Sequence, residues 1–226
     1  MTADPGRAAA AVTPLSKERV LRQAVALADN EGIDALSMRR LGRELDAGAM
    51  SLYHHVRDKE ALLDEMVDLV FAEIELPEAR RDWRAAMRAR AVSAREALLR
   101  HPWAITLMES RATPGPSNLR HREAVSGSLR QAGFSVRMAT HANWLLDSYV
   151  YGFALQETTL PFADADQLAD MTQNVFLPQL PPETYPYLNE AATELMQSGY
   201  HLADEFTYGL DLILDALERA RPSQST

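Results

Sequence analysis

The sequence of 226 residues contains no cysteine, which excludes disulfide bonds, thiolate metal ligands and cysteine nucleophiles. It also lacks a long apolar run, because the most apolar stretch, residues 142–155, is interrupted by Asn143 and Asp147 and is too short to cross a bilayer. The first residues have neither the cationic start nor the apolar core of a secretory signal. These absences predict a cytoplasmic protein with no membrane partner.

Sequence motifs of the common enzyme classes are missing as well. The chain has no HExxH, GxSxG, GxGxxG or GxxxxGK[ST] sequence, and no glutamate is followed by histidine three positions later. The histidines are scattered except for His54 and His55, and adjacent residues on a helix point about 100° apart, which disfavours a shared metal ion. We therefore expect no catalytic residue, no metal site and no cofactor.

The sequence also lacks the alternating pattern of β-strands, and this absence predicts an all-α fold. Ser16 and Ser37 are expected helix caps, Gly32 an expected helix end, and the tripeptide after Leu45 an expected turn before a short helix that reaches about His55. A longer helix should follow Arg57-Asp58. Further helices are expected at 80–100, 102–110, 117–133, 135–158, 183–198 and 202–220, and loops at 111–118 and from Leu160 through LPQLPPETYP.

The segment from Ser37 to Lys59 has a local charge that differs from that of the whole chain. The net charge is -9, yet five basic residues outnumber three acidic ones in this segment. Nucleic-acid binding depends on the local patch, so the acidic total does not exclude it. The basic residues are Arg39, Arg40, Arg43, Arg57 and Lys59.

The same segment predicts a helix-turn-helix, because its second and third short helices are joined by about three residues. The third helix offers small and hydrogen-bonding side chains that suit a major groove about 12 Å wide, while Leu45, Leu52 and Val56 are left to face the core. From composition alone, a solvated helical surface fits this pattern equally well. The side chains offered are Gly48, Ala49, Met50, Ser51, Tyr53, His54 and His55.

The stretch GIDALSMRRLGRELDAGAMSLYHHVRDKEALLDEM closely resembles the DNA-binding domain of the tetracycline-repressor (TetR) family. The resemblance spans about residues 15 to 70, and one position departs from it: Asp46 stands where the family often has glycine in the turn. Asp tolerates a left-handed conformation better than most residues, so we expect the turn to survive. The matching motif residues are Leu52, Tyr53, His55, Val56, Lys59, Glu60, Ala61 and Leu62.

The resemblance implies a ligand-released transcriptional regulator, most commonly a repressor, that binds a palindromic operator in duplex DNA as a homodimer. It implies backbone contacts from Tyr53, His55 and Lys59. Operator contacts are implied for Ser51 and Arg39, with Ala49 and Met50 helping to read bases. His54 could face either DNA or solvent.

The break at Leu76-Pro77 predicts a domain boundary. Residues 1–14 and 221–226 are expected tails, 15–76 the helix-turn-helix domain, and 77–220 a larger helical domain for ligand binding and dimerisation. This second domain resembles the tetracycline-repressor branch more weakly. There the last two long helices pair with those of a second subunit. The matching stripe on 202–220 could equally be an intrachain core face, and it consists of Phe206, Leu210, Ile213, Leu214 and Leu217.

A ligand pocket is expected among the middle helices, although an aromatic and methionine stripe also fits plain core. The candidate lining residues are Trp103, Leu107, Met108, Trp144, Asp147, Tyr151, Phe153 and Glu157. The tetracycline-contacting positions of the family are occupied here by Glu75, Arg90, Met108 and Arg111. These side chains do not suit a magnesium–tetracycline complex, and we expect another small apolar or amphipathic effector. The alternative function is a helical small-molecule-binding or protein-interaction module without DNA binding.

Overall fold

The computed structural model describes residues 14–78, 82–162, 164–197 and 201–221. These residues form helices and loops, with no β-strand among them, so the expected all-α fold is confirmed. None of the helices in this part of the chain is both long enough and apolar enough to cross a membrane. The chain divides into two compact units, residues 1–66 and 67–226, and this division lies inside one helix, ten residues before Leu76-Pro77.

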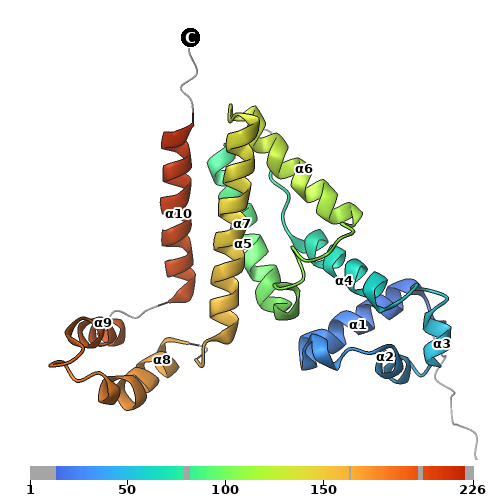
Figure 1. Ribbon diagram of the computed structural model, residues 1–226, viewed down its shortest axis with the longest axis horizontal. Coiled ribbons are helices and arrows are strands. Elements are labelled where there is room, and N and C mark those ends of the chain that lie inside the picture. Colours follow the sequence, from blue (N-terminus) through green and yellow to red (C-terminus); the bar gives the residue numbers. More distant parts are fainter. Residues whose placement is uncertain (1–13, 79–81, 163, 198–200, 222–226) are drawn as a thin grey trace, which may run out of the picture. The chain divides into compact units, whose positions relative to one another are not determined.

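Unit 1 contains α1 (Lys17–Glu31), the 3-10 turn η1 (Ile33–Ala35), α2 (Met38–Glu44), α3 (Ala49–Leu52) and the first half of α4 (Lys59–Glu73) (Figure 1). Its helix caps agree with the sequence. Ser16 and Ser37 accept hydrogen bonds of 3.2 Å from the amides of Arg19 and Arg40, and Gly32 ends α1 with a φ of 82°. The core of this unit includes Val20, Ala24, Leu27, Leu41, Leu52, Leu62 and Met66.

Unit 2 contains the end of α4, α5 (Trp83–Arg100), the 3-10 turn η2 (Pro102–Ala104), α6 (Pro116–Gln131), α7 (Val136–Thr159), α8 (Ala165–Met171), α9 (Pro186–Gln197) and α10 (Leu202–Ala220). Helix α5 packs against α6, α7 and α10. The facing sides of α5 and α7 are rich in small residues, which permit close approach of two helices. These are Ala86, Ala91, Ala94 and Ala97 on α5 and Ala139, Ala142 and Ala154 on α7.

Helix α10 lies beside α7 (Figure 1). Polar contacts also join α10 to α5. The Arg88 Nε donates to Asp211 at 3.1 Å, and the Trp83 indole N–H donates to Glu218 at 2.8 Å. An ion pair between Arg84 and Asp215 lies between these two contacts in sequence. The acidic residues of α10 therefore fix which face of this helix turns toward its own chain.

Two segments differ from the sequence-based expectations. Residues 102–110 do not form a helix, because Pro102 begins only a 3-10 turn, which is followed by short-range turns. The expected loop after Leu160 contains α8, whose N-terminus is capped by the Asp164 carboxylate at 2.8 Å from the Gln167 amide. The π-helical turn η3 (Thr172–Phe176) and the 3-10 turn η4 (Leu177–Gln179) continue it.

One glycine allows α7 and α10 to come close. The Tyr149 hydroxyl on α7 donates to the Phe206 carbonyl on α10 at 2.9 Å, and a Cβ at Gly209 would overlap that hydroxyl. The Tyr149 ring stacks on Phe206 with centroids 5.4 Å apart, so it has little freedom to move away.

We predict that Gly209→Ala lowers the free energy of unfolding by about 1 kcal/mol, the typical net value of a lost hydrogen bond. The matched control is Gly127→Ala on α6, where a Cβ would meet nothing within 4 Å. This control should raise stability by roughly 0.5–1 kcal/mol through helix propensity. Urea unfolding of both variants measures the difference, and equal shifts of the same sign would contradict the close contact.

Candidate functional site

The turn between α2 and α3 fixes the orientation of these two helices. Asp46 adopts a left-handed φ of 51°, the conformation that the sequence required of it. The Ala47 amide donates to the Gly42 carbonyl at 2.8 Å, and a Cβ at Gly42 would lie 2.8 Å from the Ala47 oxygen. Glycine is therefore needed at position 42 for α2 to meet the turn this closely.

The side chains on α3 divide into a buried set and an exposed set. Leu45, Leu52 and Val56 are buried, as predicted. The predicted DNA contacts are at the surface: Met50 is 76% exposed. Ser51, Tyr53, Lys59 and Arg39 are also exposed, as is His54, while Ala49 and His55 are half-buried. The structure thus leaves every predicted DNA-contacting side chain at least partly accessible on unit 1.

The expected helix up to His55 is too long. Helix α3 ends at Leu52, and Tyr53, His54 and His55 form a turn in which the amides of His55 and Val56 both donate to the Leu52 carbonyl, at 2.8 and 3.0 Å. These bonds turn the chain away from the helical path, and the buried Val56 follows, three residues before α4 begins at Lys59. The directions of Tyr53 and His55 therefore follow the turn and not the 100° step of a helix.

The cations around α3 fall into two groups. Arg40 pairs with Glu31, and Arg57 pairs with Asp58 at 2.8 Å. Among the described residues, Arg39, Arg43 and Lys59 form no ion pair, and all three are exposed. These three cations are available to an anionic partner, and the sequence interpretation did not select Arg43 as a contact.

Asp58 connects the turn to α4. Its carboxylate accepts from the Ala61 amide at 2.8 Å and from Arg57, and these two contacts hold the pKa of Asp58 below its usual range. A charged carboxylate at this position also interacts favourably with the helix N-terminus. Asp58 therefore fixes the first turn of α4, where Lys59 lies.

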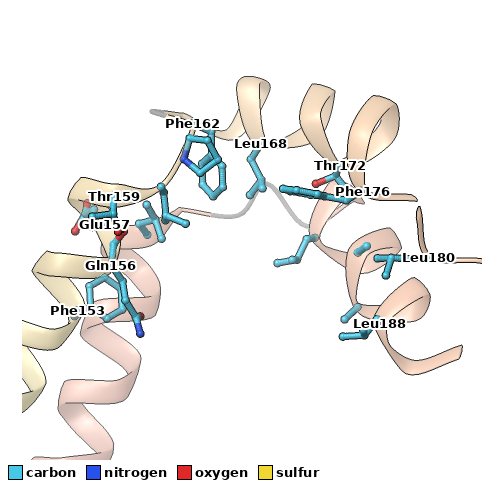
Figure 2. Close-up of a pocket in the computed structure, with 16 residues that line it drawn as sticks. Phe153, Gln156, Glu157, Thr159, Phe162, Leu168, Thr172, Phe176, Leu180 and Leu188 are labelled. Carbon is cyan, nitrogen blue, oxygen red and sulfur yellow. The ribbon is translucent and has the colours of Figure 1, made fainter. Parts of the chain in front are cut away.

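A cavity of about 560 Å³ lies in unit 2, a size typical of small-molecule sites. Figure 2 shows Phe153 and Gln156 of α7 on one side and Phe176 and Leu188 on the other. Most of the lining is apolar, with Gln156, Glu157, Thr159 and Thr172 as polar members. The remaining lining residues are Leu160, Pro161, Phe162, Leu168, Leu180, Ala191, Ala192, Leu195 and Leu202.

Only two of the predicted pocket residues, Phe153 and Glu157, line this cavity. Trp103 and Met108 are buried in the core, Leu107 is half-buried, and Trp144 is 66% exposed. The sequence prediction treated the α7 candidates as one stripe, but they occupy three faces of that helix. Asp147 and Tyr151 face the core, Phe153 and Glu157 line the cavity, and Trp144 faces solvent.

Asp147 belongs to a buried polar cluster around Arg90. The Arg90 side chain is 1% exposed, pairs with Asp147, and donates from Nε to His121 Nε2 at 3.1 Å. Burial, together with the charges of Arg90 and Arg122, lowers the pKa of His121 to about 3. Burial raises the pKa of the nearby Tyr151. His121 is therefore a neutral acceptor for Arg90, and this cluster joins α5, α6 and α7.

This cluster predicts a pH dependence of stability. The unfolded chain protonates His121 near pH 6.5 and the folded chain only near pH 3, so the unfolded state binds the proton first as the pH falls. The contribution of neutral His121 to the free energy of unfolding is complete above about pH 6.5. Between that pH and about pH 3 it falls by up to about 1.4 kcal/mol for each pH unit. Relative to His121→Gln, which keeps an acceptor, the wild type should lose stability between about pH 7.5 and about pH 5 in urea unfolding. A stability difference between the two proteins that does not change with pH would contradict this assignment.

Two protein-family models match the sequence of this chain. The model for "Bacterial regulatory proteins, tetR family" matches residues 20–66, and that for "Tetracyclin repressor-like, C-terminal domain" matches residues 76–221. The chain belongs to the TetR family. The members found by comparison are transcriptional regulators and not enzymes.

Several relatives of this TetR-family chain cover most of its length. The HTH-type transcriptional repressor DrrR1 of Streptomyces coeruleorubidus is 35% identical over 214 residues, which are 90% of this chain and 77% of that protein. The class A tetracycline repressor from transposon 1721 of Escherichia coli is 29% identical over 93% of this chain and 94% of that protein. The crystal structure of Streptomyces coelicolor ActR with actinorhodin is 31% identical, with a TM-score of 0.75 over 93% of this chain and 100% of ActR.

Four of the five residues of the expected dimer seam on α10 of this TetR-family chain face their own chain. Phe206, Leu210, Leu214 and Leu217 are buried within their own chain, and only Ile213 is half-buried. The physical reason is that the stripe packs against α5 and α7. The exposed side of α10 instead carries Tyr208 and Leu212, which are 65% and 52% exposed.

The described residues contain no group of three or more histidine or acidic side chains that could hold a metal ion. His54 and His55 remain surface residues of the turn after α3. The site that this TetR-family chain presents is therefore a surface with available cations in unit 1 and an apolar cavity in unit 2.

Proposed function

We propose that the chain is a transcriptional repressor that binds a palindromic operator as a homodimer and is released from it by a small molecule. The observation that carries the proposal is the exposed surface of α3 and the following turn, with three cations that have no ion pair among the described residues. Cations and hydrogen-bonding side chains of this kind position a protein on DNA phosphates. The operator DNA of such a repressor lies in the cytoplasm, so we expect the protein to act there.

We assign the phosphate contacts to the turn and to its flanks. Tyr53, His55 and Lys59 surround the end of α3, and Arg39 and Arg43 lie on α2. A tyrosine hydroxyl and a histidine ring N–H both donate to phosphate oxygens. These contacts set the position of α3 without specifying sequence.

We assign base reading to α3 itself. Ala49 and Met50 offer apolar contacts of the kind that recognise a thymine methyl group, and Ser51 offers a hydroxyl. The exposure of Met50 supports this role, because a largely exposed methionine on a short helix is available to a groove. His54 is more exposed than His55, so contact with either DNA or solvent stays open to it.

We predict that Lys59→Ala flattens the dependence of log affinity on log salt by about one unit, since one phosphate contact releases about one counterion. The matched control is Lys17→Ala, which removes a lysine that pairs with Glu65 at 2.8 Å. Binding isotherms on one duplex at several salt concentrations give both slopes. Identical slopes for the two variants would remove Lys59 from the contacts.

We place the DNA-binding domain at residues 15–76 and the ligand-binding and dimerisation domain at 77–220. The two family models support this division, because one ends at residue 66 and the other begins at residue 76. Helix α4 is continuous from Lys59 to Glu73 and belongs to both compact units.

We propose that the dimer forms through the exposed faces of α7 and α10. These two helices pack together and leave large apolar side chains uncovered, namely Trp144 and Leu145 on α7 and Tyr208 and Leu212 on α10. Two such pairs of helices would bury these side chains in a four-helix bundle. Ile213 lies at the edge of this face.

We predict that Leu212→Glu produces monomers, because a carboxylate in an apolar interface costs more than the contacts recover. The matched control is Leu119→Glu on α6, an equally exposed leucine outside the proposed interface. Sedimentation should give half the mass for the first variant only. An unchanged mass for Leu212→Glu would reject this interface.

The proposed ligand release requires a mechanical link between the ligand domain and α4. The Asp68 carboxylate of α4 accepts from the amides of Ser117 and Asn118 at the start of α6, at 3.2 and 2.9 Å. Glu73 accepts from Arg100 at 2.7 Å. A ligand that shifts α5 or α6 would therefore move α4, whose first turn carries Lys59, and such couplings are typically about 1–3 kcal/mol.

A further inference from the structure

The large cavity has a polar neighbour that the proposed function does not use. A second cavity of about 180 Å³ shares Glu157, Phe162, Leu168 and Leu202 with the cavity of 560 Å³. We call this second cavity the polar annex. Its other lining residues are Arg95, Asp164, Ala165, His201 and Ala203.

The large cavity is suited to a flat apolar body. Phe153, Phe162 and Phe176 line it together with six leucines. A volume of about 560 Å³ accommodates a compound of several fused rings. One end of a molecule that fills the large cavity would lie beside Glu157, which also lines the polar annex.

The charge of the polar annex is unbalanced. Arg95 is already engaged, because its Nε donates to Glu157 at 2.8 Å and its guanidinium lies 5.2 Å from the Phe206 ring centroid. Asp164 is a second carboxylate. It is exposed, and it accepts the Gln167 amide at 2.8 Å at the N-terminus of α8. No lysine or arginine among the described residues forms an ion pair with Asp164. The lining of the polar annex thus contains two carboxylates and one guanidinium, beside the imidazole of His201.

From this arrangement we infer that the cavity and the polar annex together bind an amphipathic cation, with fused rings in the large cavity and an ammonium group between Glu157 and Asp164. The inference rests on the proposed function, for which it names the class of effector. An ammonium group would supply the charge that the annex lacks, and each carboxylate retains lone pairs to accept from it.

The test uses three probes with the same anthracene body and different charges. They are 9-(aminomethyl)anthracene, which is cationic, 9-anthracenemethanol, which is neutral, and 9-anthracenecarboxylate, which is anionic. Titration calorimetry on the full chain without DNA should rank them in that order, with the cation about tenfold tighter than the alcohol, since a charge-assisted hydrogen bond is worth about one decade. Equal affinities, a tighter anion, or no binding of any probe would overturn the inference.

Two variants locate the charge. Asp164→Asn keeps a capping side chain for α8, and it should weaken the cation about tenfold while leaving the neutral alcohol unchanged. Glu157→Gln leaves Arg95 without its carboxylate and should in addition strengthen the anion. The matched control is Asp166→Asn, which removes the same charge from a position that is exposed like Asp164 but does not line the cavity. Equal weakening of all three probes, or an effect of Asp166→Asn as large as that of Asp164→Asn, would overturn the inference.

The outcome can be separated from that of the proposed function. Binding of the ligand-free protein to duplex DNA is measured in its own titration. Loss of the charge preference with intact DNA binding would reject the amphipathic cation alone. The charge preference without any DNA binding would leave the annex in place and reject the regulatory function.

Discussion

The proposed regulation depends on helix α4, whose first turn and whose Asp68 are each held by carboxylate contacts. At its start, Asp58 accepts the Ala61 amide and also pairs with Arg57. Near its end, Asp68 accepts two amides of α6. In the proposed mechanism, a ligand that displaces α6 acts on α4 through these contacts of Asp68.

The ligand domain combines small apolar contacts with buried polar ones. Alanine faces on α5 and α7 bring these helices together but bury little area for each residue. The Arg90 cluster and the contacts between α5 and α10 add direction, because hydrogen bonds and ion pairs specify one arrangement where alanines alone tolerate several. Glu157 lines both cavities and pairs with Arg95, while Asp164 has no lysine or arginine partner among the described residues.

Local signals in the sequence account for what could be predicted. The caps at Ser16 and Ser37 and the turn at Asp46 depend on residues within four positions of one another, and all three were predicted correctly. Tertiary packing decides the rest. The α10 stripe has the same periodicity whether it packs on its own chain or on a second copy, so its pattern did not reveal that Leu210 is covered by α5 and α7. The cavity could not be predicted from the sequence, because α8 forms part of its lining. The capping residue of α8, Asp164, lies in a polar stretch with several prolines nearby, and such a stretch does not indicate a helix.

The central claim is that α3 and its flanking turn recognise duplex DNA as one half of a symmetric pair. Selection from random-sequence duplexes by the full-length protein tests it most directly. The account predicts enrichment of an inverted repeat whose half-site centres lie about 34 Å, or a multiple of that distance, apart along the duplex, as two-fold symmetric helix-turn-helix proteins require. A pool that shows no enriched sequence, or an enriched site without two-fold symmetry, would contradict it.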